Sequence, residues 1–357
     1  MGKLLINATR RVSPAHIRYV RPVLARDATG PVARVYDQIE ADFGMLAPPV
    51  ALHAAAPPVL AACWCILREV LLVPGPAGRD RKEAVASAVS LANKCPYCVE
   101  VHGTTLVGLR EDADAVAVVS DRLADVTDPR LRALTEWARA SGGPDRPPAP
   151  FPPAHAPEMI GVALTFHYIN RMVNVFLRES PLPAVHGPAQ AAVRRTATRI
   201  MRSLARNHIP AGTSLDLLPP APLPPDLAWA QPAPHLAGAL ARGSAAIEAA
   251  GGRSVPVSVR ELIGVRLADP STRPPGPHVG GWLEDAVAPL PAPDRPAGRI
   301  ALLTAFASYR VTPELIDDFR RSQPTDAALI ELTSWAGLAT ARHIARDLGR
   351  DLEVTAR

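Results

Sequence analysis

Two cysteines, a histidine and a glutamate lie close together in the segment 83–102. Cys95 and Cys98 form a Cys-x-x-Cys pair, and His102 follows Cys98 at i+4, while Glu83 precedes the pair. A thiolate is the form of cysteine that attacks a peroxide or a disulfide, and a neighbouring base can take the proton of the thiol. The second cysteine can close a disulfide once the first is oxidised. These residues therefore indicate a thiol redox centre.

The elements expected around this segment bring the side chains to one place. Proline is favoured at the first position of a helix, so Pro96 predicts a helix with Cys95 as its N-cap. The field at a helix N-terminus favours a negative charge, which predicts a stabilised thiolate at Cys95 and Cys98. The i, i+4 spacing places Cys98 and His102 on one face of that helix.

Glu83 belongs to the preceding predicted helix, which begins with Asp80 as its N-cap and ends near Asn93. A turn near Asn93 and Lys94 would fold this helix back, and the carboxylate would then reach His102. The carboxylate would orient the imidazole and support its charged form. This is the arrangement of nucleophile, base and orienting group found in activated thiols.

Other interpretations of the same residues stay open at this point. A structural zinc site needs four ligands, and Cys63 and Cys65 could complete one, although they stand two apart on an apolar helix and are expected in the core. Haem attachment needs a histidine directly after the pair, where the chain has Val99. The pair could also be buried and inert, and Glu83 an ordinary first-turn acid.

The composition favours packed helices and excludes several functional classes. Hydrophobic residues make up 48% of the 357 residues but aromatic residues only 4%, so strands are disfavoured. The net charge is +5 without a lysine-rich tail or an aromatic-interleaved basic patch, which argues against nucleic-acid binding. No apolar run is long enough to span a membrane, and the start lacks the apolar core of a signal peptide. We therefore expect a soluble cytoplasmic protein.

Helical periodicity and proline clusters predict the organisation of the chain. An irregular arm (1–30) precedes a redox domain (31–208), a Pro-rich linker (209–235) and a second helical half (236–357) without cysteine. Helices of the first half are expected at Val32–Phe43, Val59–Val73, Asp112–Ser120, Asp128–Ser141, Glu158–Leu177 and Pro188–Asn207. Those of the second half are expected at Leu236–Ala250, Arg299–Tyr309 and Ala327–Leu348, with Pro-rich loops between them.

At these residues the chain resembles the AhpD-like, or carboxymuconolactone decarboxylase, superfamily. The family pattern is Glu, eleven residues, Cys-x-x-Cys, three residues and His, and Glu83 to His102 match every spacing. Asn93 before the pair, Tyr97 inside it and the segment Leu164–Phe176 are also similar to alkylhydroperoxidase-like members. The resemblance covers about residues 32–177 well, and the second half only as a cysteine-less echo.

The resemblance implies an all-α, AhpD-like helical bundle with a degenerate second half, assembled as a homo-oligomer. It implies a peroxidase or disulfide reductase that acts on a small hydroperoxide without metal or organic cofactor, re-reduced by a lipoyl- or thioredoxin-type dithiol. Carried over by position, Cys98 is the thiol activated by His102, Glu83 completes the proton relay, and Cys95 is the disulfide partner. Tyr97 stands where some members carry a second histidine, which implies a lower reactivity.

Further residues and further functions follow from the same segment and its surroundings. His167, Asn170 and Arg171 share the predicted helix that closes the redox domain. Together with Tyr97 they are candidates for lining a pocket over the dithiol, and packing between segments is the alternative. Two other functions remain: a non-catalytic helical oligomer or redox-sensing module, and decarboxylase or lactone chemistry by His102 and Glu83. The paired cysteines argue against the second of these.

Overall fold

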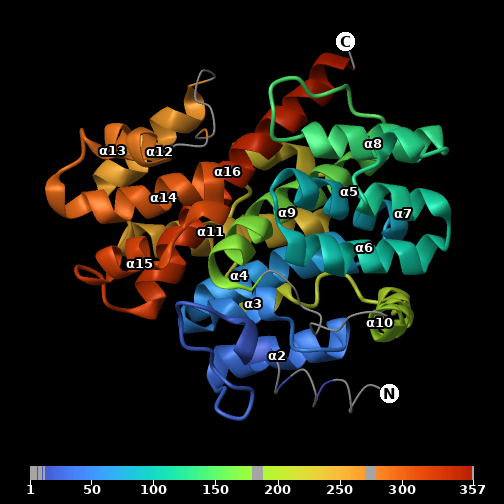
Figure 1. Ribbon diagram of the computed structural model, residues 1–357, viewed down its shortest axis with the longest axis horizontal. Helices are drawn as coiled ribbons and strands as arrows, with labels where there is room; N and C mark the ends of the chain where they lie inside the picture. Colours follow the sequence, from blue (N-terminus) through green and yellow to red (C-terminus); the bar gives the residue numbers. More distant parts are fainter. Residues whose placement is uncertain are drawn as a thin grey trace.

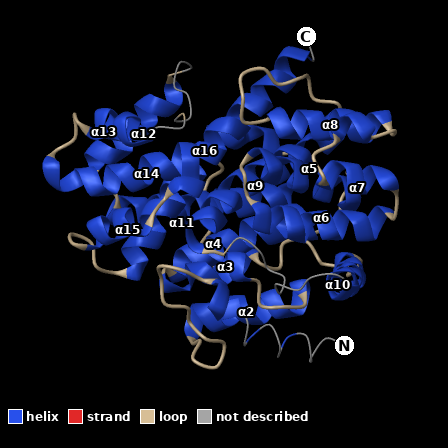
Figure 2. Cartoon of the chain, viewed as in Figure 1, coloured by secondary structure: helices blue, strands red, loops and turns tan. Residues whose placement is uncertain are grey.

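The chain folds into helices joined by loops and short turns, as its computed structural model shows (Figure 2). The structure describes residues 6, 10, 13–178, 188–269, 276 and 279–355. Within these ranges no strand forms, and one isolated bridge joins Ile17 to Leu177. The predicted all-α class is confirmed.

From α2 onward, the first half of the chain contains nine α-helices, and residues 13–16 before them are also helical (Figure 1). The nine are α2 (Gly30–Phe43), α3 (Pro48–Ala51), α4 (Pro57–Leu67), α5 (Arg79–Ala92), α6 (Pro96–Arg110), α7 (Ala113–Val119), α8 (Pro129–Ala140), α9 (Ala156–Phe176) and α10 (Pro188–Ala205). Proline occupies an early position in seven of them, α2, α3, α4, α6, α8, α9 and α10, where its missing N–H costs no hydrogen bond. Proline therefore marks the start of most of these nine helices.

The second half has more helices than its sequence pattern predicts. It contains α11 (Pro234–Ser254), α12 (Val257–Ala268), α13 (Val279–Val287), α14 (Arg295–Ala307), α15 (Pro313–Arg320) and α16 (Asp326–Thr355). The expectation of proline-rich loops between three helices was wrong for α12, α13 and α15. These helices are short and lie between prolines. The proline clusters therefore predict loops where the structure has short helices.

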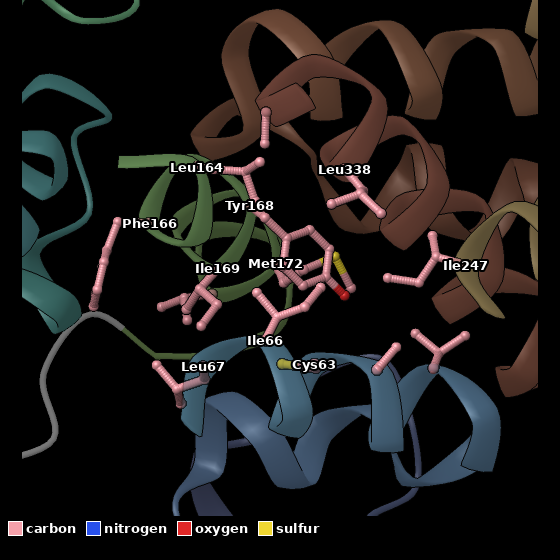
Figure 3. Close-up of a cluster of buried hydrophobic side chains, with 14 of the residues drawn as sticks. Cys63, Ile66, Leu67, Leu164, Phe166, Tyr168, Ile169, Met172, Ile247 and Leu338 are labelled. Carbon is pink, nitrogen blue, oxygen red and sulfur yellow. The ribbon is translucent and has the colours of Figure 1, made fainter. Parts of the chain in front are cut away.

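Helix α9 lies at the centre of the molecule and is buried along almost its whole length. Helix α16 packs along it, and α11 packs against α4. Figure 3 shows side chains of α4, α9, α11 and α16 meeting in one apolar cluster that includes Ile66, Tyr168, Ile247 and Leu338. The helices of the two halves therefore share one core.

The segment 209–235 contains more regular structure than its Pro-rich composition, typical of a linker, suggests. It contains two 3-10 turns, Leu215–Leu217 and Pro225–Ala230, and the side chains of Leu227 and Ala230 are fully buried. The division of the chain into an arm (1–30), a redox domain, a linker and a second domain stays a prediction. Residues 1–5, 7–9, 11 and 12 of the arm lie outside the described residues.

Buried polar contacts fix the start of α5, the helix that carries Glu83. Helix α4 continues into a π-helical turn, Arg68–Leu72, whose end leaves carbonyl groups without helical partners. The ammonium of Lys82 donates to the carbonyls of Val70 (3.1 Å) and Val73 (2.9 Å) and pairs with Glu158 of α9 (3.2 Å). These contacts tie α5 to both α4 and α9.

The expected N-cap of α5 was wrong by two residues. Gly78 is the N-cap, with φ of 82° in the left-handed region that glycine adopts without strain. Asp80 lies instead in the first turn, where a carboxylate interacts favourably with the helix dipole.

Among the described residues, no helix is both long and apolar enough to cross a membrane.

The contact between α4 and α11 gives a test of the shared core. Ile66 is buried at this contact, and a Cβ at Gly243 of α11 would lie 2.7 Å from its Cδ1. Ile66→Ala should lower the free energy of unfolding in urea by about 3 kcal/mol, because the cavity cannot close fully. Val116→Ala, at an exposed position of α7, should change it by less than about 0.5 kcal/mol. Equal effects of the two substitutions would contradict the shared core.

Candidate active site

The turn between α5 and α6 places the cysteine pair at the start of α6. Cys95 is the N-cap of α6 and Pro96 its first residue, as predicted. The backbone reverses at Lys94, which has φ of 52°, and the N–H of Cys95 donates to the carbonyl of Ser90. Helices α5 and α6 therefore pack side by side, and residues far apart in the segment 83–102 come together.

Glu83 and His102 meet across the two helices. The Nδ1 atom of His102 lies 2.8 Å from Oε2 of Glu83, and Nε of Arg79 lies 2.7 Å from Oε1 of the same carboxylate. Glu83 is fully buried, and His102 is 9% exposed. The structure thus brings together the base and the carboxylate that the sequence places on separate helices.

The electrostatics of this pair determine which nitrogen of His102 is available. Burial opposes ionisation of Glu83, but Arg79 and His102 more than offset it and lower the pKa of the carboxyl below its ordinary value. An ionised carboxylate only accepts hydrogen bonds, so Nδ1 of His102 carries the proton and donates. The Nε2 atom has no hydrogen-bond partner among the described residues and is therefore available as an acceptor.

The cysteine pair is reduced and buried. Cys95 and Cys98 are both free thiols with about 1% of their surface exposed. Burial raises the pKa of Cys98 well above its ordinary value and Cys95 raises it further, while a hydrogen bond from Asn170 acts in the opposite direction. The expectation of a stabilised Cys98 thiolate was therefore wrong, because the cost of desolvating the charge exceeds the attraction of the helix N-terminus.

Asn93 and the buried Asn170 join a network of hydrogen bonds near the thiols. The Nδ2 atom of Asn93 donates to Oδ1 of Asn170 (2.9 Å) and lies 3.2 Å from Nδ1 of His167. Asn170 donates in turn to the hydroxyl of Ser90 (3.0 Å), and Nε2 of His167 lies 2.9 Å from the hydroxyl of Ser141. Because every amide proton of Asn93 has a partner, this network holds Asn170 in place beside Cys98.

A cavity of about 290 Å³ reaches both Cys98 and His102. Tyr97 also lines it, as predicted, but most of the wall is apolar. The apolar part of the wall is formed by side chains of several elements, among them Phe43, Met45, Val50, Leu67, Ile169, Ile200 and Met201. The ring of Phe166 packs edge-on against His102 with 4.5 Å between the centroids. Thiol and base thus face one apolar space.

His167 and Arg171 lie elsewhere. They line a second cavity, of about 520 Å³, which Asn93 also borders. Burial lowers the pKa of His167 well below its ordinary value, and Arg171 lowers it further, so the imidazole is neutral. Of the candidate lining residues, only Tyr97 and Asn170 lie beside the thiols.

Sequence reasoning missed several residues of the site. Arg79 stands at i−4 from Glu83, and this spacing is the signal that could have revealed the ion pair. Ile200 and Met201 belong to the apolar face of α10, which periodicity identifies without showing what it covers. Phe43 ends the predicted amphipathic helix that begins at Val32, but the sequence does not show that it or Met45 reaches the cavity, because only the packing of α2 brings them there.

Cys63 and Cys65 lie on α4, away from this cavity wall. Both are buried, and the thiol of Cys65 donates to the carbonyl of Ser214 (2.9 Å). Burial raises the pKa of both thiols. Within the described part of the chain, no group of three or more His, Cys, Asp or Glu side chains could hold a metal ion.

Two comparisons with known proteins give matches for this chain. Residues 58–140, which hold all four residues of the thiol centre, match the carboxymuconolactone decarboxylase family. Over 340 residues the chain is 36% identical to a protein of Mycobacterium tuberculosis named alkyl hydroperoxide reductase. The alignment covers 94% of this chain and 96% of that protein, so the similarity includes the second half.

The raised pKa of Cys98 predicts the pH dependence of its reactivity. A thiol reacts as its thiolate, whose fraction grows about tenfold per pH unit below the pKa. Alkylation of Cys98 by iodoacetamide should therefore accelerate about tenfold per unit between about pH 7 and 9, as followed by peptide mass spectrometry. The urea-unfolded chain is the control and should level off near the ordinary thiol pKa of about 8.5. A plateau at lower pH in the folded chain would contradict the raised pKa.

Proposed function

The chain belongs to the carboxymuconolactone decarboxylase family, and we propose that it is a dithiol peroxidase that reduces organic hydroperoxides through Cys98 and Cys95. One observation carries this proposal: Cys98 and the imidazole of His102 line the same apolar cavity. The Nδ1 atom of this imidazole is bound to Glu83, and its Nε2 atom has no hydrogen-bond partner among the described residues. The name of the Mycobacterium tuberculosis relative supports the same chemistry.

The first step is removal of the proton from Cys98. The thiol and His102 stand at i, i+4 on α6, and Nε2 of the imidazole accepts the proton directly or through one water molecule. The imidazolium then lies against the ionised Glu83, which stabilises the positive charge. Arg79 holds the second carboxylate oxygen and keeps Glu83 ionised in its buried position. Since the resting thiol is protonated, this base is required for turnover.

The second step transfers two electrons to the peroxide. The Cys98 thiolate attacks the terminal oxygen of the hydroperoxide, so that an S–O bond forms and the O–O bond breaks. The departing alkoxide takes the proton from His102 and leaves as an alcohol. Cys98 is then a sulfenic acid. The thiol of Cys95 attacks this sulfur, an S–S bond forms, and the hydroxyl leaves with the Cys95 proton as water.

The resulting disulfide must be reduced before another turnover. A dithiol can do this by thiol–disulfide exchange, which returns two electrons and two protons to Cys95 and Cys98. We propose a lipoyl- or thioredoxin-type dithiol as the reductant. No step of this cycle needs a metal or an organic cofactor. Assembly as a homo-oligomer and a cytoplasmic location remain predictions.

The apolar cavity supports organic hydroperoxides as the substrates. Phe43, Ile169 and Met201 offer contact to an alkyl or aryl group, and burial of such a group contributes about 25 cal/mol per Å². Hydrogen peroxide gains nothing from this wall. The peroxide end of an organic substrate would lie toward Cys98 and His102, the polar part of the cavity.

Substitution of the cysteines tests the redox assignment. With cumene hydroperoxide as oxidant and dihydrolipoamide or thioredoxin as reductant, Cys98→Ser should abolish turnover, because no thiolate remains to attack the peroxide. Cys95→Ser should consume about one equivalent of peroxide and then stop, since the sulfenic acid has no disulfide partner. Cys63→Ser, in the core, is the matched control and should keep the activity of the native chain.

Two outcomes would contradict this assignment in different ways. A Cys95→Ser, Cys98→Ser double variant that retained full catalytic activity would point to acid–base chemistry by His102 and Glu83, as in lactone or decarboxylase reactions. A native chain whose thiols reacted with alkylating agents but consumed no hydroperoxide would point to a redox-sensing or structural module.

Glu83→Gln tests the role of the buried carboxylate. The amide keeps the shape of the side chain but cannot stabilise an imidazolium, so kcat/KM for cumene hydroperoxide should fall about 100-fold. The loss should shrink at high pH, where Cys98 ionises without help. Glu136→Gln, at an exposed position of α8, is the control and should have no effect. A loss of the same size at every pH would indicate a structural role instead.

A further inference from the structure

The second cavity lies between the two halves of the chain and has no part in the proposed peroxidase cycle. One wall is formed by Asn93 and Lys94 of the α5–α6 turn and by Arg171 of α9. The opposite wall comes from the second half, where Phe306 and Tyr309 close the end of α14 and the following 3-10 turn. The volume of about 520 Å³ falls in the range of small-molecule sites.

Arg171 brings an uncompensated positive charge to this cavity. Its guanidinium donates to the carbonyl of Ala305 (3.1 Å) through Nε and to the carbonyl of His167 (2.6 Å) through Nη1. The Nη2 atom has no hydrogen-bond partner, and no carboxylate pairs with Arg171, among the described residues. Burial lowers the pKa of Arg171 to about 10, so the group is still charged at neutral pH. A half-buried charge without a counter-ion favours an anion beside it.

Lys94 adds a second positive charge at the same cavity. Its ammonium lies 4.8 Å from the centre of the Tyr309 ring and 3.3 Å from the hydroxyl, and no carboxylate in the described part of the chain pairs with it. Arg139 also lines the cavity but is already paired with Asp121 (2.7 Å). The exposed Asp145, which also lines the cavity, contributes a negative charge that partly offsets those of Arg171 and Lys94. A single anionic group therefore matches the site better than a dianion.

The remaining wall residues are mostly apolar, so they favour a ligand with an apolar part as well as a charged group. Phe306 and Ile344 present aromatic and aliphatic surface, and four alanines extend it: Ala92, Ala140, Ala305 and Ala307. An inorganic ion would leave this surface in contact with water. We propose that the cavity binds a small carboxylic acid, with its carboxylate at Arg171 and Lys94 and its apolar body against Phe306 and Ile344. The second half of the chain, which has no cysteine, thereby supplies half of a binding site.

Titration calorimetry with sodium benzoate on the full-length chain tests this proposal. Benzoate should bind with a Kd on the order of 1 mM or tighter. Benzamide has the same shape without the charge and should bind at least about tenfold more weakly, because it forms no charge-assisted hydrogen bonds. Inorganic phosphate should also bind at least about tenfold more weakly, since it cannot use the apolar wall.

Substitutions locate the site. Arg171→Gln should weaken benzoate binding about tenfold or more. Lys94→Gln should weaken it severalfold, and this exposed side chain anchors no backbone, so the variant tests the site even if Arg171→Gln fails to fold. Arg122→Gln removes an exposed positive charge that is paired with Asp125, outside both cavities, and should leave binding unchanged. Circular dichroism checks the fold of each variant.

Three results would overturn the proposal. One is the absence of benzoate binding to the native chain at about 10 mM, well above the expected Kd. Another is equal binding of benzamide or phosphate, which would show that charge or apolar contact alone suffices. The third is unchanged benzoate binding in a folded Lys94→Gln or Arg171→Gln variant. None of these results bears on peroxidase activity, so the two proposals stand or fall separately.

Discussion

The buried carboxylate of Glu83 is the constraint on which the site depends. An ion in the core is tolerated only with partners, and removal of one partner of a buried pair typically costs about 3–5 kcal/mol. Here the partners are Arg79, one turn earlier on α5, and His102 on α6. Their geometry fixes the register of α5 against α6. It also fixes the tautomer of His102, and so decides which nitrogen faces the cavity. The contacts of Lys82 with α4 and α9 hold the same helix from its other side.

The protonation state of the thiols depends on two opposing effects: the cost of desolvating a thiolate and the attraction of the helix N-terminus for its negative charge. The N-terminus of α6 attracts negative charge, but an effect of this kind is typically about 0.3–1 kcal/mol, and burial of a thiolate costs more. Cys98 therefore rests as a thiol in an apolar wall, and in the proposed cycle it depends on His102 for its deprotonation. In the proposed cycle this arrangement would restrict oxidation to molecules that enter the cavity. Asn170, held by Asn93 and Ser90, offers the thiolate one hydrogen bond.

Helix α9 connects the features of the molecule. It lies in the shared core, contributes Ile169 to the cavity over the thiols, and contributes His167 and Arg171 to the second cavity. Ile169 is two residues away from both His167 and Arg171, so it points to the opposite side of the helix and the two sides line different cavities. The second half packs on this helix through α16 and forms the far wall of the second cavity. Its presence therefore has a physical consequence near the site although it carries no redox residue.

The sequence alone determined the class of fold, the helix start at Cys95 and Pro96, and the candidate residues Glu83, Cys95, Cys98 and His102, because local propensity and short spacings act within a few residues. Only the tertiary structure decided the burial that raises the pKa of Cys98, the role of Phe43 and Met45 in the cavity wall, and the separation of His167 and Arg171 from the thiols. The short helices α12, α13 and α15 were missed for a related reason: their stability comes from the core they cover, which no local pattern contains. Burial and cavity walls are made by residues distant in the chain, so spacing cannot reveal them.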